Sequence, residues 1–320
     1  MRPFEPIVSN PHLLTIASNF WPRRLDTRRF PVRERCYQTE ETVQVLAHEQ
    51  RPEGKAYGEL ILLHGLEGSS AAGYMVSMAQ AALEAGYAVC RLNMRSCGGA
   101  EHLSSTLYHA GLTCDLKRVL EIFREERRRP VYVIGFSLGG NVVLKLAGEL
   151  GEHGSELLDG VCGVSAPIDL KSCVEALERL ENYLYARRFI RRLKARYRRR
   201  SRIDPERFPT DGLERVRTVF EFDDRFTAPC FGFQGALHYY ETQSCSQYLD
   251  KIAVPALVIQ AKDDPMIPFR VFSHPAFERN HNLKLLAVEH GGHLGFLSRS
   301  GPRFWLDSVV VEWVRGLGNS

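Results

Sequence analysis

Hydrophobic and polar positions follow two alternating patterns along the chain. Apolar runs of strand length are each followed by a stretch with helical spacing of apolar residues, an order typical of βαβ units and a parallel sheet. The predicted strands are ELILLHG (59–65), YAVCRLNM (87–94), VYVIGF (131–136), GVCGVSAP (160–167), VPALVIQAKDD (254–264) and LKLLAVEHGGH (283–293). The predicted helices cover residues 72–85, 109–127, 138–150 and 303–315. We therefore expect an α/β fold with a mostly parallel central sheet and helices on both faces.

Two segments depart from this alternation. Residues 32–38 and 43–49 resemble two strands joined by a short turn, which predicts an antiparallel edge of the sheet. Residues 168–250 are mostly helical, polar and aromatic, without a clear buried strand, and they are too long for a connecting loop. We expect residues 1–320 to form a single domain, with 168–250 as a helical lid inserted after the fourth parallel strand and 1–30 as an N-terminal extension.

The positive charge of the chain is concentrated in one place. The net charge is +4, but residues 187–200, RRFIRRLKARYRRR, contribute +9 without an acid and leave −5 for the rest. Because the basicity is local, we expect no nucleic-acid binding. The apolar residues of this stretch, at positions 189, 190, 193 and 197, predict an amphipathic helix. A solvated lid helix, a peripheral membrane contact and a dock for an anionic substrate all stay open.

Composition places the chain among soluble globular proteins, since 44% of its residues are hydrophobic and 25% are charged. The N-terminal residues lack an apolar core of signal-peptide length, and no apolar run reaches the length of a membrane span. We therefore expect a cytoplasmic protein.

A serine lies between two glycines at the end of the third buried strand. Residues 135–139, GFSLG, match the G-x-S-x-G pattern of a sharp strand-to-helix turn that exposes a nucleophilic serine. The strand VYVIGF precedes the pattern and the helix predicted over 138–150 follows it, as such a turn requires. We therefore predict that Ser137 is a nucleophile.

A nucleophilic serine needs a base, and the base needs an orienting carboxylate. In the chain order Ser, acid, His, each partner follows a later strand. Asp264 follows VPALVIQ, and His293 follows LKLLAVE. Asp263 and His290 are the alternatives. We prefer Asp264 because Pro265 follows it in a tight turn, and His293 because two glycines precede it in a flexible loop.

The transition state of acyl transfer needs two backbone N–H donors for its oxyanion. The donors we predict are the N–H groups of Leu66, in the loop after ELILLHG, and of Leu138, next to the nucleophile. His64 is expected to hold that loop. No third ligand accompanies the pair His290-x-x-His293, and none of the eight cysteines forms a CxxC pair, so we expect no metal and no cofactor.

Taken together, the chain resembles the α/β-hydrolase superfamily and, within it, the YheT-like esterase branch. The resemblance rests on NPHLLT (10–15), LHGLEGS (63–69), RSCG (95–98, a looser match), GFSLGGN (135–141), DDP (263–265) and GGH (291–293). It implies hydrolysis of carboxylic esters, often of acyl or lipid-like small molecules, through an acyl-enzyme. An acyltransferase on the same triad and a non-catalytic binding protein with this fold are the alternative functions.

Overall fold

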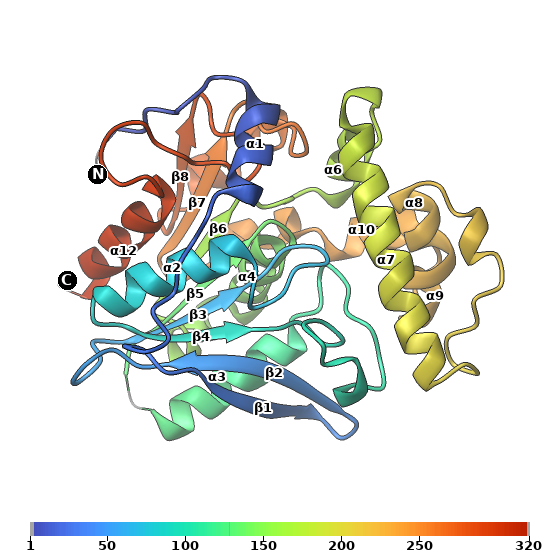
Figure 1. Ribbon diagram of the computed structural model, residues 1–320, viewed down its shortest axis with the longest axis horizontal. Helices are drawn as coiled ribbons and strands as arrows, with labels where there is room; N and C mark the ends of the chain where they lie inside the picture. Colours follow the sequence, from blue (N-terminus) through green and yellow to red (C-terminus); the bar gives the residue numbers. More distant parts are fainter. Residues whose placement is uncertain (1–2, 128, 319–320) are drawn as a thin grey trace.

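The computed structural model describes residues 3–127 and 129–318 and is built around one central sheet (Figure 1). The sheet has eight strands in the order β1-β2-β4-β3-β5-β6-β7-β8. Their bounds are β1 (Arg33–Glu40), β2 (Val43–Gln50), β3 (Glu59–Leu63), β4 (Ala88–Leu92), β5 (Val131–Phe136), β6 (Gly160–Val164), β7 (Ala256–Ala261) and β8 (Leu283–Val288). The predicted fold class is confirmed.

The pairing of the strands divides the sheet into two parts. Strands β1 and β2 pair antiparallel with each other, and β2 pairs antiparallel with β4, so the predicted antiparallel edge is confirmed. All other neighbours, from β4 to β8, pair in parallel. In such sheets the ligand site lies beyond the carboxyl ends of the parallel strands.

Helices cover both faces of the sheet because successive strand residues point to opposite sides. On β3, Leu60 packs in the core layer that includes α2 and α12, whereas Ile61 packs in the layer that includes α3 and α4. The helices outside the insertion are α1 (Pro11–Phe20), α2 (Gly73–Glu84), α3 (Cys114–Glu126), α4 (Leu138–Leu150), α5 (Gly154–Leu157), α11 (Ala276–Arg279) and α12 (Trp305–Gly318).

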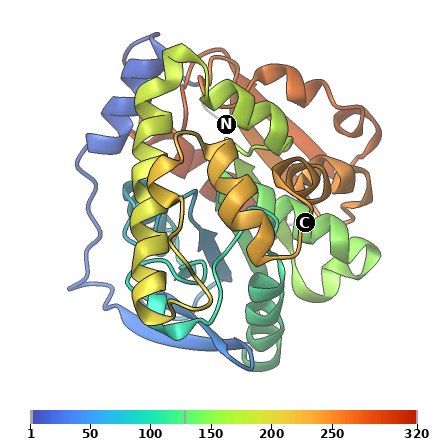
Figure 2. The same cartoon turned by 90° about the vertical axis from the view of Figure 1, so that its right-hand side faces the viewer.

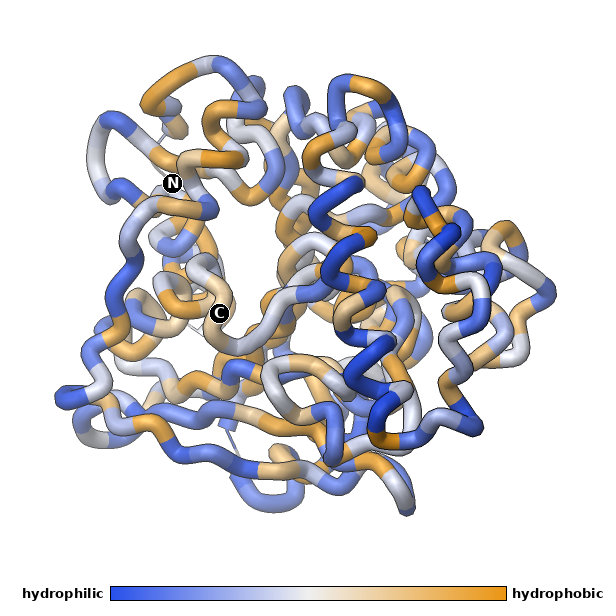
Figure 3. The backbone as a smooth tube through the Cα atoms, turned by 45° about the vertical axis from the view of Figure 1, so that its right-hand side comes forward, coloured by the Kyte–Doolittle hydropathy of each residue, from blue (hydrophilic) through white to orange (hydrophobic). Residues whose placement is uncertain are grey.

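The segment between β6 and β7 is helical, as predicted, and all of its residues are described. It contains no strand, and its helices are α6 (Leu170–Leu177), α7 (Tyr183–Ile203), α8 (Val219–Phe222), α9 (Ala228–Cys230) and α10 (Ala236–Gln243). Figure 1 shows these helices as a layer at one end of the sheet, and Figure 2 shows the long α7 running beside α1. In Figure 3 hydrophilic colours dominate α7, whereas orange apolar stretches gather in the interior.

The arginine-rich stretch forms part of α7, as its spacing predicts. Ile190, Leu193 and Tyr197 are buried on one side, which leaves most of the basic side chains on the other.

Two local predictions need correction. The helix expected from residue 109 begins at Cys114, because His109 and Ala110 belong to a buried loop in which the Ala110 N–H donates to the Tyr239 hydroxyl of the insertion. The N-terminal extension contains an unpredicted helix, α1. Its Pro11 does not interrupt the helix but starts it, with the Asn10 side chain capping the first turn.

Candidate active site

Ser137 lies at the sharp turn between β5 and α4. Its backbone has φ +52° and ψ −121°, a sparsely populated conformation for a residue with a side chain. The two glycines of the motif allow this turn: a Cβ on Gly135 would collide with the backbone of Gly139, and one on Gly139 would lie 2.5 Å from the carbonyl oxygen of Leu63. The close contact of strand and helix therefore requires glycine at both positions, and it leaves the Ser137 side chain at the carboxyl edge of the sheet.

A chain of hydrogen bonds leads from Ser137 to a buried carboxylate. The Nε2 atom of His293 lies 3.0 Å from the Ser137 hydroxyl, and its Nδ1 atom lies 2.9 Å from Asp264 Oδ2. A carboxylate only accepts hydrogen bonds, so Nδ1 carries the ring proton and Nε2 is the acceptor for the serine hydroxyl. The structure thus brings together Ser137 and the two partners preferred from the sequence, in the arrangement of nucleophile, base and orienting acid.

Asp264 is more deeply buried than Asp263, the alternative acid, and accepts more hydrogen bonds. Its side chain is fully buried, and its Oδ1 atom accepts the backbone N–H groups of Met266 and Ile267 at 2.9 and 3.1 Å. Asp263 instead faces His290, at 3.1 Å, in a pair whose histidine side chain is 46% exposed. The second pair contacts the loop before His293 rather than Ser137.

The two predicted oxyanion donors, the N–H groups of Leu66 and Leu138, flank the serine. Both residues line a pocket together with Ser137. Within residues 3–127 and 129–318, neither N–H has a hydrogen-bond acceptor in the protein. Leu138 opens α4, where the first N–H groups of a helix have no partner within it.

His64 holds the loop that carries Leu66. Met94 donates its N–H to Nε2 of His64, so Nδ1 carries the proton and donates to the Gly65 carbonyl at 2.8 Å. Burial lowers the pKa of His64 to about 4. The neutral ring orients the peptide just before the predicted donor.

Thr15 of α1 contacts the other side of the site and was missed by the sequence analysis. Its hydroxyl oxygen accepts the backbone N–H of His293 at 2.8 Å. Gly292, at φ +56°, fits against this helix because a Cβ there would lie 2.6 Å from the Thr15 hydroxyl. The NPHLLT and GGH motifs therefore pack against each other, and the threonine that ends the first motif was the available signal.

Two pockets meet at Ser137 and His293. The first, named here the apolar pocket, holds about 100 Å³ between the sheet and the insertion. Most of its lining is hydrophobic, including Leu170, Leu177, Leu193, Val219, Met266 and Ile267. Its polar side chains include Asp223, which accepts the hydroxyls of Tyr240 and Thr227, each at 2.7 Å, and whose pKa burial raises to about 6.

The second pocket, named here the arginine pocket, is wider, at about 360 Å³. Helix α1, the loop 65–73 and helix α7 form its walls, and Arg188 and Arg192 of α7 stand among its lining residues. Ser137 therefore lies between a narrow apolar pocket and a wider pocket whose lining is mixed and more polar.

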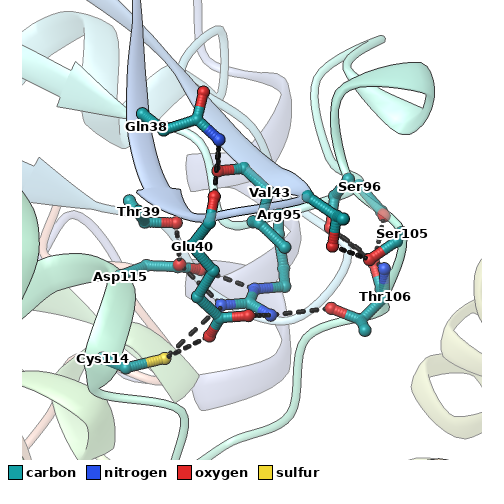
Figure 4. A network of polar contacts seen from close by, with 12 residues as sticks. Gln38, Thr39, Glu40, Val43, Arg95, Ser96, Ser105, Thr106, Cys114 and Asp115 are labelled. Carbon is teal, nitrogen blue, oxygen red and sulfur yellow. Dashed lines mark hydrogen bonds and ion pairs between the residues drawn. The ribbon is translucent and has the colours of Figure 1, made fainter.

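Three side chains from β1 and α3 carry atoms of the kind that bind metals and lie close together (Figure 4). Glu40, Cys114 and Asp115 place their ligand atoms within 4.8 Å of one another. The buried guanidinium of Arg95, however, lies among them, with Nη2 at 2.6 Å from Asp115 and 2.9 Å from Glu40. Since Arg95 supplies the positive charge and also donates to Thr106 at 2.7 Å, the cluster is an ion-pair network that anchors the loop after β4.

Of the described helices, none combines the length and apolarity needed to cross a membrane.

Several known proteins are similar to this chain in sequence. The sequence pattern of the α/β hydrolase fold matches residues 59–300. The Escherichia coli (strain K12) protein named "Putative esterase YheT" is 32% identical over 313 residues, which cover 96% of this chain and 90% of that protein. Phospholipase ABHD3 and monoacylglycerol lipase ABHD2 of Mus musculus are 28% and 27% identical, each over 81% of this chain. The matches span 63% and 65% of those two proteins, less than two thirds of either.

Solved structures show the same fold. The Pyrococcus furiosus esterase Pf2001 superposes with a TM-score of 0.61 at 17% identity, covering 99% of this chain and 98% of that one. Est1E from Butyrivibrio proteoclasticus reaches 0.59 at 13% identity, covering 90% and 99%. At these identities the likeness concerns the fold alone. Together with the family pattern and the similarity to YheT, it leads to one conclusion: the chain belongs to the α/β hydrolase fold family, in the YheT-like branch.

Proposed function

We propose that this protein hydrolyses carboxylic esters through an acyl-enzyme, with Ser137 as nucleophile, His293 as general base and Asp264 as the orienting carboxylate. The observation that carries the proposal is the continuous hydrogen-bond chain from Asp264 through His293 to the Ser137 hydroxyl, at 2.9 and 3.0 Å. The relatives named "Putative esterase YheT", phospholipase ABHD3 and monoacylglycerol lipase ABHD2 support the proposal.

Acylation begins when His293 Nε2 takes the proton of Ser137 and the serine oxygen attacks the ester carbonyl. The N–H groups of Leu66 and Leu138 donate hydrogen bonds to the carbonyl oxygen and stabilise the negative charge that develops on it. Asp264 stabilises the imidazolium that forms. His293 then gives its proton to the alcohol oxygen as the bond to the alcohol breaks.

Deacylation repeats these steps with water in place of the serine hydroxyl. His293 takes a proton from the water, the hydroxide adds to the acyl carbonyl, and Ser137 leaves with the proton returned by His293. The steps use only this chain, water and the ester.

The two pockets suggest how an ester is oriented. An acyl chain fits the apolar pocket, whose hydrophobic lining favours its burial, and the alcohol part then faces the wider arginine pocket. Residues 168–250 act as a lid in this proposal, because α6 and α7 supply walls of the apolar pocket. The substrate class is a small-molecule ester with an apolar acyl part.

Replacement of the nucleophile tests the proposal. Ser137→Ala is expected to lower kcat for p-nitrophenyl butyrate by about 10⁴-fold or more, since a triad without its nucleophile loses nearly all its rate enhancement. Circular dichroism and thermal melting serve as the folding control. A folded Ser137→Ala protein with wild-type turnover would refute the proposed mechanism.

A further inference from the structure

The arginines of α7 differ in their partners. Three of them form ion pairs with acids: Arg196 with Glu67, Arg198 with Glu214 and Arg199 with Glu101. Arg188 and Arg192 make only long hydrogen bonds of 3.3 Å, to the Asn19 side-chain oxygen and the Glu67 carbonyl. In the part of the chain that the structure describes, neither has a carboxylate within ion-pair distance.

Arg188 and Arg192 both lie at the arginine pocket. They are four residues apart, so they lie on the same face of the helix, one turn from each other. Both side chains are exposed at the arginine pocket, whose lining also includes Ser137 and His293. Two guanidinium groups therefore stand on the side of the serine that the proposed function assigns to the alcohol.

Among the described residues that line the pocket, no carboxylate is free to balance these two charges. Glu67 is the acidic residue in its lining, and its carboxylate already pairs with Arg196 at 2.6 Å and accepts the Tyr108 hydroxyl at 3.1 Å. Partial desolvation against the pocket wall, and then the positive charge of Arg192, lower the pKa of Arg188. Two like charges side by side without a counter-charge favour a bound anion.

The beginning of α2 adds positive potential to the same pocket. Ala71, Ala72 and Gly73 line it, the N-cap Ala72 provides no side-chain hydrogen bond, and the first turn of the helix contains no acid. The N–H groups at the start of a helix attract anions. The start of α2 is therefore a second source of positive potential in the pocket, beside the two arginines.

We propose that the arginine pocket binds a phosphate carried by the alcohol part of the ester, so that the preferred substrates are acyl esters of a phosphorylated alcohol such as glycerol phosphate. The inference rests on the proposed function and deepens it. The phosphate is held and not cleaved: water and the ester yield the carboxylic acid and the free phosphorylated alcohol. Guanidinium groups suit this role because their paired donors match phosphate oxygens.

A matched substrate set tests the proposal. The substrates are 1-hexanoylglycerol, its 3-phosphate and its 3-phosphocholine, which share a short acyl chain that keeps them in solution, so membrane recruitment does not contribute. The wild-type enzyme is expected to show a kcat/KM at least about tenfold higher for a phosphorylated ester than for the neutral one. The two phosphorylated esters distinguish a phosphomonoester from a phosphodiester headgroup, and a preference for either supports the proposal.

A matched pair of variants assigns the effect to the two arginines. In Arg188→Gln/Arg192→Gln, the ratio of kcat/KM for the preferred phosphorylated ester to that for the neutral ester is expected to fall at least about tenfold. The control, Arg187→Gln/Arg191→Gln, removes the same charge from exposed positions of the same helix that do not line the pocket. Its ratio is expected to stay within about twofold of wild type.

Three results would overturn the proposal. A wild-type preference for the neutral ester excludes a phosphate subsite, as does an unchanged ratio in Arg188→Gln/Arg192→Gln. An equal fall in both double variants assigns the effect to the overall charge of α7. In each case continued hydrolysis of p-nitrophenyl butyrate shows that the proposed function stands although the subsite is wrong, whereas no hydrolysis of any ester refutes both.

Discussion

The hydroxyl oxygen of Thr15 accepts a 2.8 Å hydrogen bond from the backbone N–H of His293, although 278 positions separate the two residues. The same hydroxyl donates to the Pro11 carbonyl at 2.7 Å, so its orientation is set within α1. The N-terminal helix thereby supports the loop that presents the predicted general base to Ser137.

Removal of this acceptor is expected to slow turnover without unfolding the protein. Thr15→Val keeps the shape of the side chain but leaves the His293 N–H without its partner, and a small shift of a base costs rate. We expect kcat for p-nitrophenyl butyrate to fall about tenfold and KM to change less than about twofold. Thr15→Ser, which restores the hydroxyl, should recover most of the rate; equal kinetics for the two variants would show that the contact does not position His293.

The adjacent aspartates provide a matched comparison for the predicted acid. Asp264→Asn would present an amide to Nδ1 of His293 and favour the wrong ring tautomer, so kcat is expected to fall by about 10³- to 10⁴-fold. Asp263→Asn weakens the pair with His290 but keeps a side-chain oxygen that can accept the Gly292 N–H, now 2.9 Å from Asp263 Oδ1, so it should change kcat less than about threefold. Steady-state kinetics of the two variants decide the assignment, and the reverse order would make Asp263 the acid.

Asp223, in the apolar pocket, is expected to make stability depend on pH. Burial raises its pKa to about 6, above the value of about 3.9 in an unfolded chain. The native state therefore holds the proton more tightly, and its stabilising contribution is lost as the pH rises from about 4 through 6. Relative to Asp223→Asn, the wild-type free energy of unfolding should fall by about 2 kcal/mol between pH 4 and pH 7. Urea denaturation at several pH values measures this difference, and parallel curves would contradict it.

Arg95 is expected to be critical for stability because it forms ion pairs with both Glu40 and Asp115. Its side chain is 2% exposed, and Arg95→Met would leave Asp115, itself 10% exposed, without its counter-charge. We expect a loss of about 3–5 kcal/mol in the free energy of unfolding. The control is Arg118→Met, which removes an exposed ion pair with Glu121 and should cost less than about 1 kcal/mol. Similar losses in urea denaturation would mean that the buried network contributes no more than a surface pair.

The order of elements and the residues proposed for the triad could be inferred from the sequence because their signals are local. The elbow around Ser137 needs glycines at fixed offsets, and each strand of the parallel sheet has its own apolar run. The preference for Asp264 over Asp263 used only the proline that follows it. These signals do not depend on how distant segments meet.

What could not be predicted depends on long-range contacts. The role of Thr15 requires α1 to lie against the loop of His293. Helix α3 begins later than predicted because Ala110 donates a hydrogen bond to Tyr239 of the insertion. The spacing within the arginine-rich stretch predicts its helix, but not that Arg196 pairs with the Glu67 carboxylate while Arg192 reaches only the Glu67 backbone carbonyl and has no carboxylate of the described residues within ion-pair distance. Those differences arise only from how the insertion sits over the sheet.

The most direct test of the central claim, that Ser137 is the nucleophile, is covalent labelling of the wild-type protein with a fluorophosphonate followed by peptide mass spectrometry. A serine activated by His293 should displace fluoride and gain one phosphonyl adduct, which stops ester hydrolysis in proportion to labelling. We predict a single adduct on the peptide that contains Ser137, and none in Ser137→Ala. An adduct on another residue, or full esterase activity in a protein that acquires no adduct, would contradict the account.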